Sequence, residues 1–189
     1  MSEVVIPDPS LVVLIGAAGS GKSTFAAQQF SPEEILSSDR FRAIVSGDEA
    51  DQAATHAAFK RLHRELARRL ASRRLAVVDA TSVEPRARRA LLDQAAVAGI
   101  PAIAIVLDLP AEVVLARNAS RGRVVDEAVV RRHLGRLRTG LDGPDPPLRR
   151  EGFAQVIVLR DPAEVKAVRI RRRPDPSREV ATPTRRTPS

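Results

Sequence analysis

The chain has 189 residues, which is the length of one domain with a core large enough to fold without disulfides or metal ions. It contains no cysteine, which excludes a disulfide framework and a thiolate metal site, and no apolar run approaches the roughly 20 residues of a membrane-spanning helix. The net charge of +8, carried by 28 arginines and 3 lysines, favours an anionic partner such as a nucleic acid or a nucleotide, although arginine-rich usage also follows from a GC-rich genome. The N-terminus lacks the basic and apolar regions of a signal peptide, so we expect a cytoplasmic protein.

A glycine-rich turn follows the first strongly apolar strand, residues 11–15. Its sequence is Gly16-Ala17-Ala18-Gly19-Ser20-Gly21-Lys22-Ser23-Thr24, which fits the phosphate-binding pattern G-x-x-x-x-G-K-[ST] without a mismatch. The strand, turn and helix start favour this interpretation over a turn that binds nothing. We therefore expect ATP and Mg²⁺ as ligands, with Lys22 on the β- and γ-phosphates and the Ser23 hydroxyl on the metal. The predicted nucleotide-binding residues are Gly16, Gly19, Ser20, Gly21, Lys22, Ser23 and Thr24.

The remaining elements alternate between strand and helix. Further strands are expected at 34–38, 75–79, 102–107 and 155–159, and helices at about 22–30, 39–45, 51–73, 85–98, 110–121 and 127–141. Pro110 opens one of these helices and Asp126 caps the last. This alternation predicts an α/β fold, a three-layer sandwich with a five-stranded, mostly parallel sheet between helical layers.

Polar residues follow the second and third strands, at the edge of a parallel sheet where ligands bind. Asp39 and Arg42 lie three residues apart on one helix face, where a carboxylate could accept a hydroxyl proton and a guanidinium could hold an anion. A helix cap beside a solvent-facing arginine explains the spacing equally well. Asp79 ends an apolar strand, a placement that favours a carboxylate near Mg²⁺ over a second cap.

Three arginines surround the end of the helix after the fourth strand. Arg117 and Arg121 share a helix face, Gly122 offers a hinge, and Arg123 follows. Such cations could form a mobile lid over a transferring phosphoryl group, but a solvated basic face is the more common fate of an arginine run. The three histidines, at positions 56, 63 and 133, have no ligands at metal spacing, so we expect surface or core roles for them.

Six segments of the sequence, taken in their order along the chain, resemble the kinase domain of bacterial polynucleotide kinase-phosphatases and, more broadly, the P-loop polynucleotide 5′-hydroxyl kinase family. The resemblance covers residues 10–165 and rests on G-x-x-G-S-G-K-S-T-F, S-S-D-x-x-R, D-x-x-x-T-x-x-A-F, V-D-A-T, R-N-x-x-R-x-R and E-G-F. These segments are Gly16–Phe25, Ser37–Arg42, Asp51–Phe59, Val78–Thr81, Arg117–Arg123 and Glu151–Phe153.

The resemblance implies ATP-dependent phosphorylation of a 5′-hydroxyl end of DNA or RNA. It implies that Asp39 is the general base, that Arg42 contacts the phosphate beside the acceptor hydroxyl, and that Arg117 and Arg121 are lid arginines, with Arg123 on the nucleotide. It places Mg²⁺ at Ser23 and Asp79. Residues 1–170 would be the kinase domain, with a lid at 117–126 and a short edge segment at 165–170, and the basic, proline-rich residues 171–189 are expected to be disordered.

Two departures from the family leave the acceptor open. No phosphatase or ligase domain follows in this sequence, and Ser82 stands where the family pattern suggests asparagine. A P-loop kinase of a small molecule or a nucleotide sugar, of the zeta-toxin type, is therefore the main alternative. A nucleotide-binding ATPase without an acceptor is a further one, because a fold does not determine a function.

Overall fold

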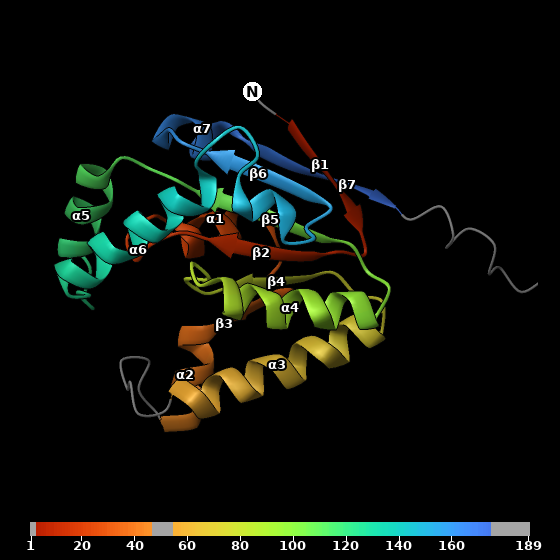
Figure 1. The fold of residues 1–189 in the computed structure, drawn as a ribbon. Coiled ribbons are helices and arrows are strands. Elements are labelled where there is room, and N and C mark those ends of the chain that lie inside the picture. The colour runs from red at the N-terminus through yellow and green to blue at the C-terminus, as the bar shows by residue number, and fades with distance from the viewer. Residues whose placement is uncertain (1–2, 47–54, 175–189) are drawn as a thin grey trace, which may run out of the picture.

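The computed structural model describes residues 3–46 and 55–174, and a five-stranded parallel sheet forms its centre (Figure 1). The strands are β2 (Leu11–Ile15), β3 (Ile35–Ser37), β4 (Ala76–Asp79), β5 (Ala102–Leu107) and β6 (Gln155–Leu159). Their order across the sheet is β3-β4-β2-β5-β6, and every neighbouring pair is parallel. The predicted α/β class and all five predicted strands are confirmed.

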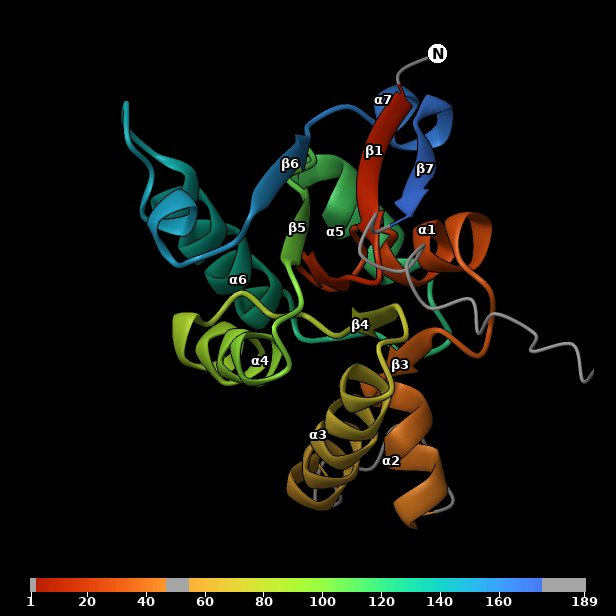
Figure 2. The same cartoon turned by 90° about the vertical axis from the view of Figure 1, so that its right-hand side faces the viewer.

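Helices cover both faces of this sheet (Figures 1 and 2). They are α1 (Lys22–Gln29), α2 (Ser38–Ser46), α3 (Thr55–Ala71), α4 (Pro85–Val97), α5 (Ala111–Ala119), α6 (Glu127–Leu141) and α7 (Pro162–Ala167), with a 3₁₀ turn η1 (Pro147–Arg150). Asp126 caps α6 as predicted, accepting hydrogen bonds from the backbone N–H groups of Ala128 and Val129. Across residues 3–46 and 55–174, no helix has both the length and the apolar character needed to cross a bilayer.

Alternation along β2 decides which helices pack on which face. Leu11, Val13 and Ile15 belong to the core shared with α3, α4 and α6, whereas Val12 and Leu14 belong to the core shared with α1. All five residues are fully buried. A strand buried on both faces reads as a continuous apolar run, which is why this strand was recognisable from sequence.

The strand order brings the polar segments of the sequence to one edge of the sheet. β4 lies between β2 and β3, so the turn after β2 adjoins the loop after β4, and the Gly16 N–H donates to the Thr81 carbonyl over 3.1 Å. Ser37 at the end of β3 pairs in register with Asp79 at the end of β4. The start of α2 therefore lies two strands away from the glycine-rich turn.

A second, two-stranded sheet lies beside the main one and was not predicted. β1 (Glu3–Asp8) pairs in parallel with β7 (Arg169–Pro174). The edge segment expected at 165–170 is wrong, because α7 occupies residues 162–167 and β7 joins β1 instead of the main sheet. Residues 171–174, which the sequence assigned to the tail, belong to β7. The expected start of the 51–73 helix and the expected disorder of 175–189 fall outside the described residues.

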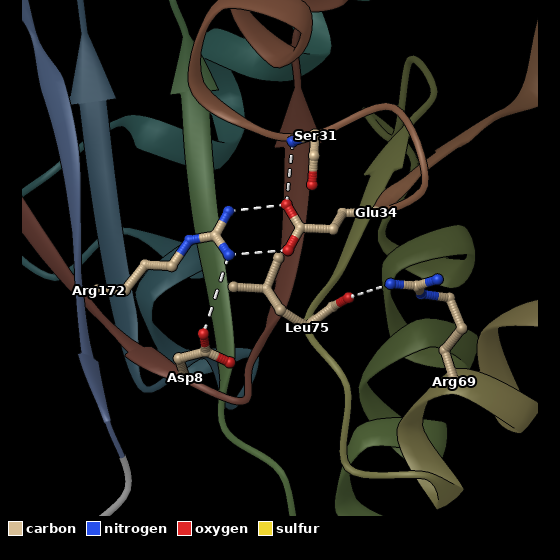
Figure 3. Close-up of polar contacts among 6 residues, drawn as sticks. All are labelled: Asp8, Ser31, Glu34, Arg69, Leu75 and Arg172. Carbon is tan, nitrogen blue, oxygen red and sulfur yellow. Dashed lines mark hydrogen bonds and ion pairs between the residues drawn. The ribbon is translucent and has the colours of Figure 1, made fainter.

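Arg172 anchors β7 to the main sheet (Figure 3). Its guanidinium donates two hydrogen bonds to the Glu34 carboxylate, at 2.8 and 2.7 Å, and lies 3.9 Å from Asp8. Burial alone would raise the pKa of Glu34, but Arg172 and the Ser31 backbone N–H hold it below its ordinary value. Arg69, which lies on the other side of Leu75, donates a hydrogen bond of 2.9 Å to the Leu75 carbonyl. These contacts lie away from the edge where β2, β3 and β4 end.

Candidate active site

The glycine-rich turn has the strand–turn–helix geometry that the pattern predicts. Gly19 and Gly21 have φ of +86° and +94°, a region that favours glycine, and Gly21 is the residue before α1. A Cβ on Gly19 would lie 2.4 Å from the Val114 carbonyl oxygen, so the turn is packed directly against α5. The chain can follow this path only with glycine at position 19.

Lys22 lies in the first turn of α1 and folds back over this turn. Its Nζ donates to the carbonyls of Gly16 and Ala17 at 2.9 and 2.8 Å, and lies 3.4 Å from Ser20 Oγ. Burial lowers the pKa of Lys22 from 10.5 to about 8; Asp79 opposes this shift and Arg121 adds to it. A polyphosphate beside this ammonium would favour its charged form.

Binding of ATP is therefore expected to take up protons above pH 8. At about pH 8.5 much of Lys22 is neutral in the free protein, and a bound polyphosphate would restore its charge. The affinity should fall as the pH rises from about 7.5 to about 9.5, by up to roughly tenfold per unit above the pKa. Titration calorimetry in two buffers of different ionisation enthalpy measures the uptake. Equal proton uptake at about pH 7 and about pH 8.5 would contradict this role of Lys22.

Asp39 lies at the start of α2, across the cleft from the glycine-rich turn. Its carboxylate forms an ion pair with Arg42, one helical turn on, and the Arg123 guanidinium approaches the same oxygen to 3.5 Å. The Asp39 side chain is 37% exposed and Arg42 is buried. Asp39 is thus open to a ligand while two cations, one from α2 and one from the segment after α5, flank it.

Ser23 and Asp79 face the same cleft from α1 and from the end of β4. Asp79 is buried, and its charge is close enough to Lys22 to affect the pKa of that amine. Mg²⁺ in kinase sites takes one or two protein oxygen ligands and completes its shell with phosphates and water. A serine hydroxyl and one carboxylate beside a phosphate-binding turn fit that requirement, and when bound the ion would neutralise charge on the phosphates.

The predicted lid begins at the C-terminal end of α5, which lies beside α6 (Figure 1). Arg117 reaches over the turn, with one terminal nitrogen 3.6 Å from the position that a Cβ on Gly21 would occupy. Arg121 lies close enough to lower the pKa of Lys22. Both side chains are exposed and line the cleft, so the cationic character expected of this segment faces the glycine-rich turn.

The cleft has a volume of about 760 Å³ and contains most of the predicted site residues. Those lining it are Gly19, Gly21, Lys22, Ser23, Thr24, Asp39, Arg42, Asp79, Arg117, Arg121 and Arg123. Gly16 and Ser20 do not line it; they are buried behind the turn, where the Ser20 N–H donates to the Ala17 carbonyl. The structure therefore brings together residues from α1, α2, β4 and the segment after α5.

Several lining residues were missed by sequence reasoning. An apolar wall comes from α3, the loop after β4 and α4, and consists of Phe59, Leu62, Val83, Ala87 and Leu91. Histidines 63 and 133 also line the cleft, contrary to the expectation of surface or core roles. His133 Nδ1 is buried without a hydrogen-bond partner among the described residues, and burial, Arg132 and Lys22 lower the pKa of its imidazole. No spacing signal in the sequence marks these positions.

An ion pair between the buried Arg88 and the half-buried Glu151 supports the loop between β4 and α4. Arg88 donates to both carboxylate oxygens of Glu151, at 2.6 and 2.5 Å, and to the Ser82 carbonyl at 2.9 Å. Ser82 has φ of +48°, which is uncommon for a residue with a side chain. Glu151, part of the E-G-F segment, therefore holds the loop that carries Thr81 and Val83 into the cleft.

Glu151→Gln is expected to lower the free energy of unfolding by about 3–5 kcal/mol, because the buried Arg88 would lose its charged partner. Urea denaturation measures this loss. The matched control is Glu127→Gln, which breaks an exposed ion pair with Arg131 and should change stability by less than about 1 kcal/mol. Equal losses for the two variants would contradict a structural role for Glu151.

The fold and the cleft define a P-loop kinase-like domain. Residues 11–144 match the AAA domain family AAA_33, and the chain belongs to that family. No curated protein matches the chain.

Several solved structures share this fold. A candidate kinase from Chloroflexus aurantiacus J-10-fl is 18% identical, with a TM-score of 0.58, and the match covers 81% of this chain and 88% of that one. A chain of the Pnkp1/Rnl/Hen1 RNA repair complex is 24% identical, with a TM-score of 0.57, and the match covers 70% of this chain but only 45% of that one. In a second structure of the complex the identity is 25% and the TM-score 0.51, and the match covers 64% of this chain and 41% of that one. A sugar kinase from Janibacter sp. HTCC2649 is 21% identical, with a TM-score of 0.52, over 83% and 90%.

Proposed function

We propose that this protein is an ATP-dependent phosphotransferase that phosphorylates the 5′-hydroxyl end of DNA or RNA. The observation that carries the proposal is the position of Asp39, which is partly exposed, lines the same cleft as the phosphate-binding turn and is flanked by Arg42. A carboxylate in that position suits transfer to a hydroxyl better than hydrolysis of the nucleotide alone.

In the proposed reaction, Asp39 accepts the proton of the acceptor hydroxyl, and the oxygen of that hydroxyl forms a bond to the γ-phosphorus of ATP. The bond from that phosphorus to the β,γ-bridging oxygen breaks, and ADP leaves. Lys22, Arg117 and Arg121 neutralise charge on the transferring phosphoryl group, and Arg123 and the turn hold the nucleotide. Residues 1–170, together with the remainder of β7 to Pro174, would act as one catalytic domain, with residues 117–126 as its lid.

The composition of the acceptor side supports a nucleic-acid end. Arg42 lines the cleft beside Asp39, where a guanidinium suits a phosphate next to the reacting hydroxyl, and Phe59 with its apolar neighbours offers a surface for the faces of a base. A positive net charge also suits a polyanion. The resemblance in the ordered set of motifs, and the 25% identical chain of the Pnkp1/Rnl/Hen1 complex, point in the same direction.

A kinase of a small molecule or a nucleotide sugar is the second candidate. A cleft of about 760 Å³ has the size of a small-molecule site, and Phe59 is the one Phe, Tyr or Trp side chain among the described residues that line it. Few side chains of the cleft can therefore stack on a base, which suits a small acceptor.

One experiment separates these candidates. The protein is incubated with γ-labelled ATP, Mg²⁺ and either a 5′-hydroxyl oligonucleotide or a panel of sugars, sugar acids and nucleosides. Label on the oligonucleotide supports the leading proposal. Label on small molecules alone supports the second candidate, and release of phosphate without labelled acceptor would leave an ATPase.

A further inference from the structure

Asn118 is a buried polar residue in the last turn of α5, only 3% exposed. Its side-chain amide makes two hydrogen bonds to one distant backbone unit. Nδ2 donates to the Val125 carbonyl at 2.7 Å, and Oδ1 accepts from the Val125 N–H at 3.2 Å. The amide therefore acts as donor and acceptor at once and satisfies both backbone groups of Val125.

These two bonds close the segment 119–124 into a loop that carries Arg121 and Arg123. Val125 is followed directly by Asp126, the cap of α6, so both ends of the loop are fixed to helices. A lid that swings freely about Gly122 is therefore not what the structure contains. The loop is held at its base, and Arg123 extends from it to within 3.5 Å of the Asp39 carboxylate.

The same end of α5 is packed on the phosphate-binding turn. A Cβ on Gly19 would lie 2.4 Å from the Val114 carbonyl oxygen and 3.0 Å from the Asn118 backbone nitrogen. No space separates the turn from the backbone of Asn118. The base of the lid and the nucleotide-binding turn thus form one packed unit, and the position of Val125 relative to the turn depends on the Asn118 amide.

We propose that Asn118 is a positioning residue, which fixes the lid loop on the phosphate-binding turn and thereby places Arg121 and Arg123 over the cleft. Its effect on activity rests on the proposed function, in which these arginines act on phosphates. Its effect on the conformation of the loop does not depend on any activity. The positioning role of Asn118 and the proposed function can therefore be disproved independently.

Asn118→Asp is the first variant to measure. The carboxylate can still accept from the Val125 N–H, but it cannot donate to the Val125 carbonyl and would repel it. We expect trypsin to cleave after Arg121 and Arg123 about tenfold faster, because proteolysis follows local opening, while the thermal midpoint of the whole chain changes little. We expect kcat for phosphoryl transfer to fall by roughly 10- to 100-fold, because a misplaced Arg121 no longer neutralises the transferring group. The KM for ATP should rise by less than this factor, because Arg123 is displaced but the phosphate-binding turn and Lys22 still hold the nucleotide.

The matched control is Thr139→Ala, which removes the hydrogen bond from Thr139 Oγ1 to the Gly135 carbonyl on α6, outside both the lid and the cleft. This control should change neither the rate of tryptic cleavage nor kcat.

If Asn118→Asp does not fold, hydrogen exchange of the unaltered protein tests the same two hydrogen bonds. The Val125 amide should exchange at least about tenfold more slowly than the amides of Arg123 and Val124. Unchanged cleavage in the folded variant, or a Val125 amide that exchanges as fast as these neighbours, would overturn the proposal. Slow exchange and faster cleavage without any phosphoryl transfer would instead overturn the proposed function alone.

Discussion

Asp39→Asn is expected to lower kcat for transfer to a 5′-hydroxyl by about 10²- to 10⁴-fold, the usual contribution of a general base. The amide keeps the size of the side chain but cannot accept the hydroxyl proton. The KM for ATP should change little, since the phosphate-binding turn and Lys22 are untouched. Initial rates with labelled ATP at saturating oligonucleotide measure the effect.

The control for this variant is Asp93→Asn. Asp93 also forms an ion pair with an arginine on its own helix, Arg89, but the pair is exposed and lies outside the cleft. Its loss should leave kcat unchanged. An unchanged kcat for Asp39→Asn, as in the control, would show that Asp39 serves only as an ion-pair partner in the first turn of α2.

Lys22→Met is expected to lower kcat by at least about 10³-fold, because the Lys22 ammonium lies within the turn itself, where it would neutralise the transferring phosphoryl group. The same change should alter the pH dependence of stability. Since burial lowers the pKa of Lys22 to about 8, burial of the charged amine disfavours folding below that pH, and this penalty fades as the pH rises from about 8 to 10.5. The free energy of unfolding should rise over that range in the unaltered protein and lack this contribution in Lys22→Met.

Lys60→Met serves as the control, since Lys60 is exposed on α3. It should change neither the rate nor the pH dependence of urea unfolding. If Lys22→Met retained the unaltered protein's rate, or if its stability rose with pH in the same way, Lys22 would not be the buried cation of a phosphate site.

Much of the fold could be predicted from the sequence because its signals are local. The apolar runs of β2 and β5 and the Asp126 cap of α6 are each encoded within a few residues. The helix α7 was missed although its signal is local too: Asp161 and Glu164 form a capping box around Pro162. The apolar residues of 165–170 suggested a strand, but the capping box starts a helix that runs through residue 167.

The second sheet could not be predicted, because its two strands lie at opposite ends of the described chain. β7 has the sequence Arg-Ile-Arg-Arg-Arg-Pro and is mostly exposed, so its composition is that of a basic tail. It becomes a strand by pairing with β1 and through the contacts of Arg172 with Glu34 and Asp8. Pairing between strands so far apart in the chain produces no hydrophobic periodicity by which the strands could be recognised in the sequence.

The candidate site was predicted residue by residue, but not how its residues meet. The phosphate-binding pattern and the rule for strand ends brought Lys22, Asp39 and Asp79 to one edge. The approach of Arg123 to Asp39, the support of the Ser82 loop by Arg88 and Glu151, and the clamp of Asn118 on Val125 join residues from separate elements. They depend on tertiary packing, which spacing along the chain does not encode.

The most direct test of the central claim compares one oligonucleotide with a 5′-hydroxyl and the same oligonucleotide with a 5′-phosphate, each incubated with γ-labelled ATP and Mg²⁺. The products are digested to mononucleotides and separated. A 5′-hydroxyl kinase should place label in the 5′-terminal mononucleotide of the 5′-hydroxyl strand only, and Asp39→Asn should abolish it. Absence of label from both strands, with label transferred to a sugar or nucleoside instead, would contradict it.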